Sequence, residues 1–429
     1  MQYQYHDAKA YNLHLFKTSK FKTITIMINF RRNIVKDEIT IRSFVHPLLL
    51  LSSKSFPSGR LLAREAERLY GPYIGANENR VGNYALTSFY MTMLSEQYTE
   101  PDMNAKCLSF FKEIIFNPDV SNNGFNKQSF DIVKNEIKAR LKSIKDNPKY
   151  YSMVKMLENM DAKSPISYRG GYLEDLDKID EFKVFDYYSS MLHSDIIDIF
   201  ILGDIDFDDT KKMISDMVPI NTIKKQKEDL YINHKRFSKR LREFSDEEKL
   251  SQAKLVIGCK IGELSPFENK YVLPLYSDIL GGPSYSKLFQ SVREKNSLAY
   301  YIYSNYRRAD SILTVSSGIN KESYNKTLKL IKAEFDNMSK GNISEDELKR
   351  AKEDMLSIIQ NIEDKPLHLI NNCMWQLLYG LDDIETRKKE LFKVTIDDIK
   401  NIGKKIHIDT VYLLHGGEND EATSDKEDE

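Results

Sequence analysis

Cysteine is scarce in this chain of 429 residues, which contains only Cys107, Cys259 and Cys373. They are separated by more than a hundred residues along the chain, which excludes a CxxC zinc or redox site. An odd and sparse count also argues against a disulfide framework. We therefore expect all three cysteines to be small core residues.

Long hydrophobic runs are missing as well. The longest, at residues 44–51, is interrupted by His46 and Pro47 and is too short to span a bilayer. The N-terminal sequence MQYQYHDAKAYNLHLF has no basic region followed by an apolar stretch, so it does not have the pattern of a signal peptide. These absences predict a cytoplasmic protein that does not associate with membranes.

The chain has almost no net charge, since 63 Lys and Arg residues oppose 64 Asp and Glu residues. Without a strong positive field, nucleic-acid binding is not expected. Seven acids and one Lys are concentrated in residues 418–429, which we predict to be a disordered acidic tail. Hydrophobic residues make up 41% of the sequence, enough to build sizeable cores, and the length suits two domains.

What the sequence does contain is a weak internal repeat, in which similar segments follow one another in the same order. Each half has an alternating strand-like run, a Pro-Ser entry to a helix, a second strand-like run, a long charged helix ending before Pro, and a late strand before Gly. The matching pairs are 21–30 with 252–261, the stretches from Pro57 and Pro283, those from Leu86 and Ile312, the helices ending at Pro148 and Pro366, and 195–204 with 409–417.

This repetition predicts two duplicated α+β halves, at residues 1–218 and 234–417, joined by a polar, Lys-rich linker at 219–233. Neither half alternates strands and helices regularly. We therefore expect helices packed on a largely antiparallel sheet in each half, rather than a doubly wound parallel sheet.

The histidines bear on whether the chain can bind a catalytic metal. A helical zinc site of the HExxH or HxxEH type needs two imidazoles four residues apart beside a carboxylate base. No two of the eight histidines are closer than eight residues, so this pair is absent. The GxSxG nucleophile elbow and the glycine-rich phosphate motifs are absent too.

Residues 280–300, LGGPSYSKLFQSVREKNSLAY, resemble the second-half signature of the insulinase/pitrilysin-type zinc peptidases, in the branch of the processing peptidases. Ser297 replaces the usual Gly of that signature, and Lys287 the usual Arg. The family has two duplicated α+β halves, so the resemblance extends to about residue 417. The matching residues are Leu280, Gly281, Gly282, Leu288, Phe289, Gln290, Arg293, Glu294, Leu298, Ala299 and Tyr300.

The first half resembles the family at FPSGRLLAREAERLYG, from Phe56, and this phrase anchors the alignment upstream. The resemblance implies that His46 retains the first ligand position of HxxEH, whereas Leu49 and Leu50 replace the general base and the second ligand. It also implies that Glu136 retains the distal carboxylate. Such a degenerate site cannot hydrolyse peptides in the usual way, so zinc is expected in a partner subunit and not in this chain. Pro47 is further expected to disfavour a helical conformation at His46.

The resemblance also supplies a role for a chain without HxxEH. In heterodimeric members, the degenerate subunit contributes its second-half Arg and Tyr to the shared cavity. Arg293 would then hold a substrate carbonyl or carboxylate, and Tyr300 would donate a hydrogen bond to the oxyanion. The structural alternative is that Arg293 pairs with Glu294 or another acid and Tyr300 is a core residue.

The leading hypothesis is therefore a non-catalytic, substrate-binding subunit of a heterodimeric zinc metallopeptidase, active as an endopeptidase only with an HxxEH-bearing homologue. Its other expected partner is the peptide substrate, and it could form a homodimer when alone. One alternative is an inactive scaffold or peptide-binding protein with the same fold. Another is a self-sufficient homodimeric peptidase with an unconventional metal site, which the histidine spacing disfavours.

Overall fold

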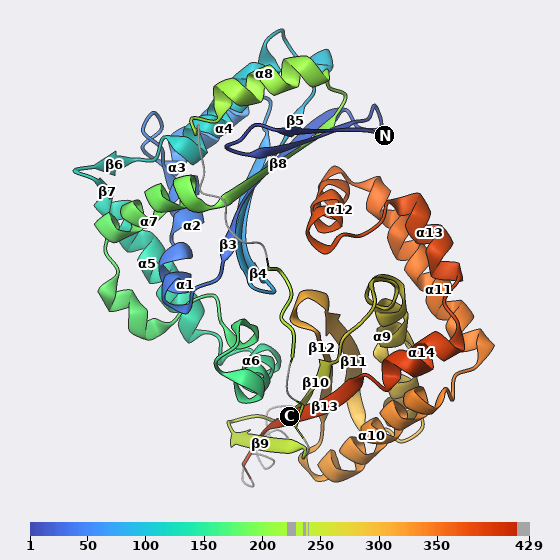
Figure 1. The fold of residues 1–429 in the computed structure, drawn as a ribbon. Helices are drawn as coiled ribbons and strands as arrows, with labels where there is room; N and C mark the ends of the chain where they lie inside the picture. The colour runs from blue at the N-terminus through green and yellow to red at the C-terminus, as the bar shows by residue number, and fades with distance from the viewer. Residues whose placement is uncertain (221–228, 235–236, 239, 418–429) are drawn as a thin grey trace, which may run out of the picture. The chain divides into compact units, whose positions relative to one another are not determined.

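The structure is a computed structural model that describes residues 1–220, 229–234, 237–238 and 240–417 (Figure 1). The predicted acidic tail at 418–429 lies outside the described residues, as does part of the predicted linker. The helices are α1 (Ile39–Arg42), α2 (Val45–Leu51), α3 (Gly59–Arg68), α4 (Met103–Phe116), α5 (Lys127–Lys142), α6 (Pro148–Asp161), α7 (Glu181–Ser194), α8 (Phe207–Met217), α9 (Leu273–Gly281), α10 (Tyr324–Lys340), α11 (Glu345–Asn361), α12 (Pro366–Tyr379), α13 (Ile384–Phe392) and α14 (Ile396–Gly403). The strands are β1 (Gln2–Asp7), β2 (Asn12–Lys17), β3 (Thr23–Asn33), β4 (Tyr73–Val81), β5 (Tyr84–Leu94), β6 (Val120–Ser121), β7 (Gly124–Phe125), β8 (Ile196–Gly203), β9 (Arg242–Glu247), β10 (Ala253–Ile261), β11 (Ala299–Arg307), β12 (Ile312–Ile319) and β13 (Ile406–His415).

The chain divides into two compact units that do not simply follow the order of the sequence. The first unit contains Met1–Lys142, Arg169–Leu230 and Ile362–Leu378. The second contains residues 143–168 and 231–361, and the chain from Tyr379 onward. Each unit thus includes one helical segment from the other half of the sequence, α6 in the second unit and most of α12 in the first.

Each unit is built on one large sheet, and the two sheets have the same topology. The first has the order β1-β2-β8-β3-β5-β4, and the second the order β11-β12-β10-β13-β9. The β2–β8 pair and the β9–β13 pair are parallel, and every other pairing in these two sheets is antiparallel. The series β2-β8-β3-β5-β4 therefore matches β9-β13-β10-β12-β11 strand by strand. The predicted α+β fold, with two duplicated and largely antiparallel halves, is confirmed.

The central strands β3 and β10 correspond to the first pair of repeated segments. Nearly all of their residues are buried, because elements pack on both faces of each sheet. In the second unit, Gly258 of β10 faces α6, where an added Cβ would lie 2.3 Å from the sulfur of Met156. Successive residues of a strand point to opposite faces, so Cys259 faces the other layer. Cys107, Cys259 and Cys373 are all buried and free, as expected for core residues.

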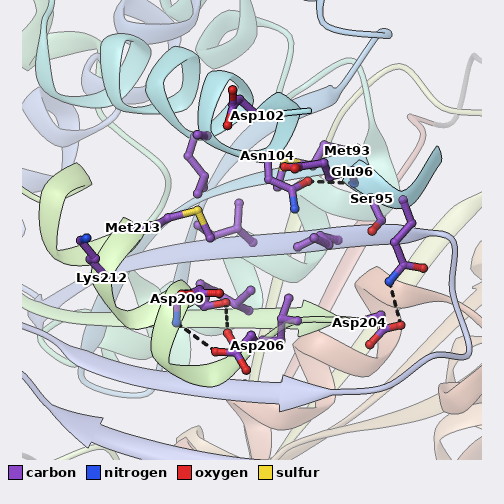
Figure 2. Close-up of a pocket in the computed structure, with 18 of the residues that line it drawn as sticks. Met93, Ser95, Glu96, Asp102, Asn104, Asp204, Asp206, Asp209, Lys212 and Met213 are labelled. Atoms are coloured by element: carbon purple, nitrogen blue, oxygen red, sulfur yellow. Dashed lines mark hydrogen bonds between the residues drawn. The ribbon is translucent and has the colours of Figure 1, made fainter. Parts of the chain in front are cut away.

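A cavity of about 660 Å³ opens in the first unit, between the ends of β3, β5 and β8 and the helices α4 and α8 (Figure 2). Its floor is apolar and its rim is acidic. Asp206 is the N-cap of α8 and accepts hydrogen bonds from two backbone N–H groups of its first turn, whereas Asp204 accepts one from Gln97 at 3.1 Å. Asp209 and Asp102 lie at helix N-termini, where the helix dipole favours negative charge. Helix capping, the helix dipole and the hydrogen bond from Gln97 thus account for most of the acidic side chains at the rim.

Across the residues that the structure describes, no helix has both the length and the apolar character needed to cross a membrane.

Candidate functional site

The degenerate site of the first half begins on α2, where His46 is the second helical residue. The expectation that Pro47 disfavours a helical conformation at His46 is wrong, since His46 is helical. Pro47 occupies the first turn of α2, where backbone N–H groups have no intrahelical acceptor, so its missing N–H removes no helical hydrogen bond. His46 is partly buried, and its Nδ1 is buried without a hydrogen-bond partner among the described residues.

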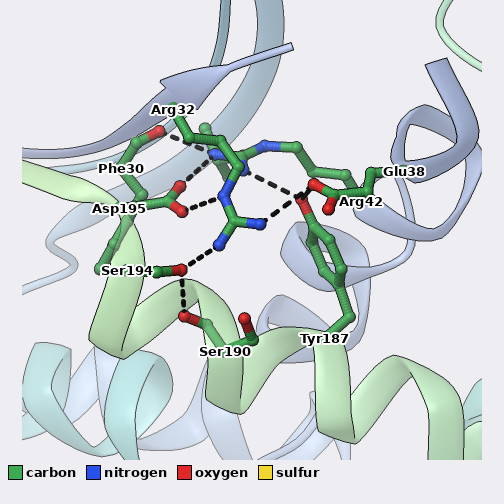
Figure 3. A network of polar contacts seen from close by, with 9 residues as sticks. Phe30, Arg32, Glu38, Arg42, Tyr187, Ser190, Ser194 and Asp195 are labelled. Atoms are coloured by element: carbon green, nitrogen blue, oxygen red, sulfur yellow. Dashed lines mark hydrogen bonds and ion pairs between the residues drawn. The ribbon is translucent and has the colours of Figure 1, made fainter. Parts of the chain in front are cut away.

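A network of buried ion pairs holds the segment just before α2 in place (Figure 3). Arg42 is 1% exposed and donates hydrogen bonds to Asp195 at 2.9 Å and to the carbonyl oxygen of Phe30 at 2.8 Å. Asp195 also pairs with Arg32. The network therefore ties α1 to β3 and to the start of β8, and it fixes the backbone four residues ahead of His46.

The resemblance implies that Leu49 and Leu50 replace the general base and the second ligand. Leu49 is completely buried, and Leu50 is half-buried on the same helix. Alkyl side chains neither coordinate a metal nor accept a proton from water. Two of the positions that the family uses for chemistry therefore belong to the packing of α2.

The electrostatic surroundings of His46 also disfavour a cation. Burial, together with the charge of the nearby Arg140 guanidinium of α5, lowers the pKa of His46 to about 4. On β4, burial raises the pKa of Glu78 to about 7, although Arg42 and Arg140 oppose this rise. A positively charged Arg140 thus lies near the place where the family binds a dication.

Glu136, the proposed distal carboxylate, is exposed on α5, one helical turn before Arg140. Over the described ranges, no three His, Cys, Asp or Glu side chains come close enough together to hold a metal ion. One partly buried imidazole, two leucines and a neighbouring guanidinium do not fit zinc.

The second-half signature begins where α9 approaches β11. An added Cβ at Gly281 would lie 2.6 Å from the backbone nitrogen of Ser304, and one at Gly282 would lie 2.8 Å from the carbonyl oxygen of Asp278. Both positions therefore require glycine for steric reasons. The two glycines allow the end of α9 to pack closely on β11.

Arg293 lies in the π-helical turn Phe289–Glu294, with its guanidinium 4.7 Å from the centre of the Phe289 ring. The chain then turns at Ser297, whose φ is +51° and whose backbone N–H donates to the carbonyl oxygen of Arg293. This left-handed conformation explains why the family signature has glycine at this point. Ser297 adopts the same turn at a cost in backbone strain.

Tyr300 follows at the start of β11, where the register with β12 is interrupted between Ala299 and Tyr301. Such a bulge re-aims the side chain of the extra residue. The Tyr300 side chain is accordingly 76% exposed and is not a core residue.

Arg293 and Tyr300 line the same hollow, which has a volume of about 470 Å³ and is also bordered by Gln252, Ser297 and Asn320. No described carboxylate, Glu294 included, lies within ion-pairing distance of Arg293, which excludes the predicted structural alternative in this part of the chain. The structure therefore brings together the two second-half residues. The four positions of the degenerate site, in contrast, do not form a common ligand set.

Sequence reasoning missed two features of the molecule. One is the Arg42–Asp195 network, whose members are 153 residues apart and carry no local motif. The other is a cavity in the second unit lined by Arg308, Lys270 and Tyr379. Its sequence signal is the pair Arg307-Arg308 at the end of β11.

Comparisons with known proteins agree with this geometry. Residues 178–355 match the family model described as Peptidase M16 inactive domain. Over 94% of its length, the chain is 27% identical to the probable inactive metalloprotease YmfF of Bacillus subtilis, of which the alignment covers 96%. A shorter match, 28% identical, covers 36% of this chain and 39% of the uncharacterized zinc protease YmxG of the same organism.

Among solved structures, a conserved protein from Enterococcus faecalis matches with a TM-score of 0.91 and 25% identity, covering 97% of this chain and 99% of that one. A protease from Helicobacter pylori shares the fold, with a TM-score of 0.79, 13% identity, and coverage of 96% and 99%. With its duplicated sheets and its second-half signature, the chain is similar to proteins of the M16 family, and it is metalloprotease-like without an HxxEH motif.

Proposed function

We propose that this chain is the non-catalytic, substrate-binding subunit of a heterodimeric zinc metallopeptidase in the cytoplasm. An HxxEH-bearing homologue would supply the zinc and the general base, and this chain would supply Arg293 and Tyr300. The observation that carries the proposal is the contrast between the two halves. The first-half site is apolar and cationic, whereas Arg293 and Tyr300 remain accessible in one hollow.

Each of the two residues would have a distinct role. During hydrolysis at the partner's zinc, negative charge develops on the scissile carbonyl oxygen, and the exposed phenol of Tyr300 would donate a hydrogen bond to it. Arg293 would hold a backbone carbonyl or carboxylate of the peptide, since a guanidinium presents several donors in a fixed geometry. Neither role requires a metal in this chain.

The test is steady-state kinetics of the complex reconstituted from this chain and an HxxEH-bearing homologue of the same source. Tyr300→Phe should lower kcat by a factor of about 10²–10³ without changing assembly or the zinc content of the complex. Arg293→Ala should mainly raise KM, because its contact acts on ground and transition states alike. Tyr303→Phe, on the same strand, is the matched control and should leave both constants near the wild-type values.

The competing function is an inactive scaffold or peptide-binding protein with the peptidase fold. It predicts wild-type kinetics for Tyr300→Phe complexes whose thermal melting is unchanged. A chain purified alone that holds one zinc ion, lost on His46→Ala, would contradict both functions.

A further inference from the structure

A cavity of about 780 Å³ in the second unit lies apart from the hollow of Arg293 and Tyr300. Tyr300 is at the start of β11, and Arg308 directly follows the end of that strand. Eight residues of extended chain separate them by roughly 26 Å. The cavity is therefore a separate place on the same sheet, within the size range of small-molecule sites.

Arg308 is the unusual member of this cavity. Its Nε is buried without a hydrogen-bond acceptor, and no carboxylate among the described residues lies within ion-pairing distance of its guanidinium. The group instead lies near two aromatic rings, 5.7 Å from the centre of Tyr306 and 5.5 Å from that of Tyr379. The guanidinium, which lines the cavity and has no acid partner among the described residues, would therefore favour a ligand that brings an acceptor with a negative charge.

The acids around the cavity are already engaged by other groups. Asp382 accepts hydrogen bonds from Lys270, which lies 3.1 Å from both carboxylate oxygens, and from Tyr271. Asp310 pairs with Arg307 at 2.8 Å. Of the lining residues, Glu263 is an acid exposed at the rim.

A second, partly buried arginine lies nearby. Burial lowers the pKa of Arg387, and the charge of Arg308 lowers it further, which means that the two guanidinium groups are close enough to repel. Because Lys270 and Asp382 neutralise each other, Arg308 is the lining cation without an ion-pair partner among the described residues, and it lies beside aromatic walls formed by Tyr231 and Tyr379.

We propose that this cavity binds the carboxylate of an organic acid, with the C-terminus of a peptide as its source. The planar guanidinium of Arg308 matches a carboxylate in a two-point geometry. The rings of Tyr231 and Tyr379 would pack against the apolar part of the ligand. The choice of a peptide rests on the proposed function, but the anion site itself rests on Arg308.

Isothermal titration calorimetry on the full chain tests the proposal with three probes: the tripeptide Gly-Gly-Phe as a free acid, the same peptide with a C-terminal amide, and inorganic phosphate. The free acid should bind, and the amide should bind at least about tenfold more weakly, because it lacks the charge that Arg308 recognises. Equal affinity for acid and amide would overturn the proposal. Arg308-dependent binding of phosphate without binding of the free acid would overturn the carboxylate assignment.

Substitutions separate a binding role from a structural one. Arg308→Met should lower the affinity for the free acid at least about tenfold, while the melting temperature stays the same or rises, since an unpaired buried charge is removed. Arg350→Met, at an exposed arginine of α11, is the matched control and should bind the free acid normally. Wild-type affinity in Arg308→Met would contradict the proposal, as would a large fall in its melting temperature with unchanged affinity. None of these measurements needs the partner subunit, so their failure would leave the role of Tyr300 untouched.

Discussion

Ser297 donates its backbone N–H to the carbonyl oxygen of Arg293 across 2.9 Å, while its own φ is +51°. This one turn ends the helical segment that carries Arg293 and starts the strand that carries Tyr300. The geometry of the hollow therefore depends on a residue that contacts no ligand in the proposed mechanism.

Ser297→Gly should stabilise the protein by about 0.5–1 kcal/mol. Glycine relieves the strain of the left-handed conformation, and the greater freedom of the unfolded chain offsets part of the gain. Urea denaturation measures the difference. Ser297→Ala keeps the strain and should have nearly wild-type stability, so equal stabilisation by Ala and Gly would contradict this explanation.

Gly281→Ala should destabilise the protein by about 1–3 kcal/mol, because the new methyl group would meet the backbone of Ser304, which cannot move without displacing β11. Thermal melting of the purified chain measures the effect. The control is Gly59→Ala at the start of α3, where the nearest atom to an added Cβ is 3.7 Å away. If both variants had the melting temperature of the wild type, close packing of α9 on β11 would not explain why residue 281 is glycine.

Asp195→Asn should cost about 3–5 kcal/mol of stability, since it leaves the guanidinium groups of Arg32 and Arg42 without their shared buried carboxylate. Chemical denaturation gives the value. Asp131→Asn removes the exposed ion pair with Lys127 and should cost less than about 0.5 kcal/mol. Similar losses in the two variants would mean that burial does not strengthen the network.

The pH dependence of stability should reveal the surroundings of His46. Its pKa is about 4 in the folded state, whereas an unfolded histidine titrates near 6.5, so protonation favours unfolding. The protein therefore has its full stability above about pH 6.5. Its free energy of unfolding decreases as the pH falls toward 4, by up to about 2 kcal/mol at pH 4.5.

Melting curves of wild type and His46→Leu at pH 7 and pH 4.5 check this prediction. The wild type should lose more stability than His46→Leu over this interval. His6→Gln, at an exposed position of β1, should follow the wild type. Parallel losses in wild type and His46→Leu would show that His46 is not held in its neutral form.

Local patterns in the sequence predicted much of the fold. The alternating runs predicted the central strands β3 and β10, and the order of the repeated segments predicted the duplication. Pro47 misled the prediction for α2, because the cost of proline depends on its position within the helix. The pairing of Arg42 with Asp195 could not be predicted, since the fold alone brings residues so distant in sequence into contact.

For the candidate site, the signature predicted Arg293 and Tyr300, and the structure adds the bulge that exposes Tyr300. The absence of an HxxEH motif, with Leu49 and Leu50 in its place by the resemblance, was visible in the sequence. The approach of Arg140 to His46 was not, because it depends on how α5 packs beside α2.

Because α6 and α12 are exchanged between the two units, the order of synthesis at the ribosome limits when each unit can complete its packing. The side chains of Met156, Leu157 and Met160 on α6 pack in a core with Val256 of β10 and Tyr412 of β13. The strand β10 is translated roughly 90 residues after α6, and β13 comes last of all. The nascent chain therefore presents an apolar helix face that has no native partner until β10 is made, and its core is complete only with β13. The first unit likewise waits for α12, so each unit completes its native packing only after residues far along the sequence have been translated.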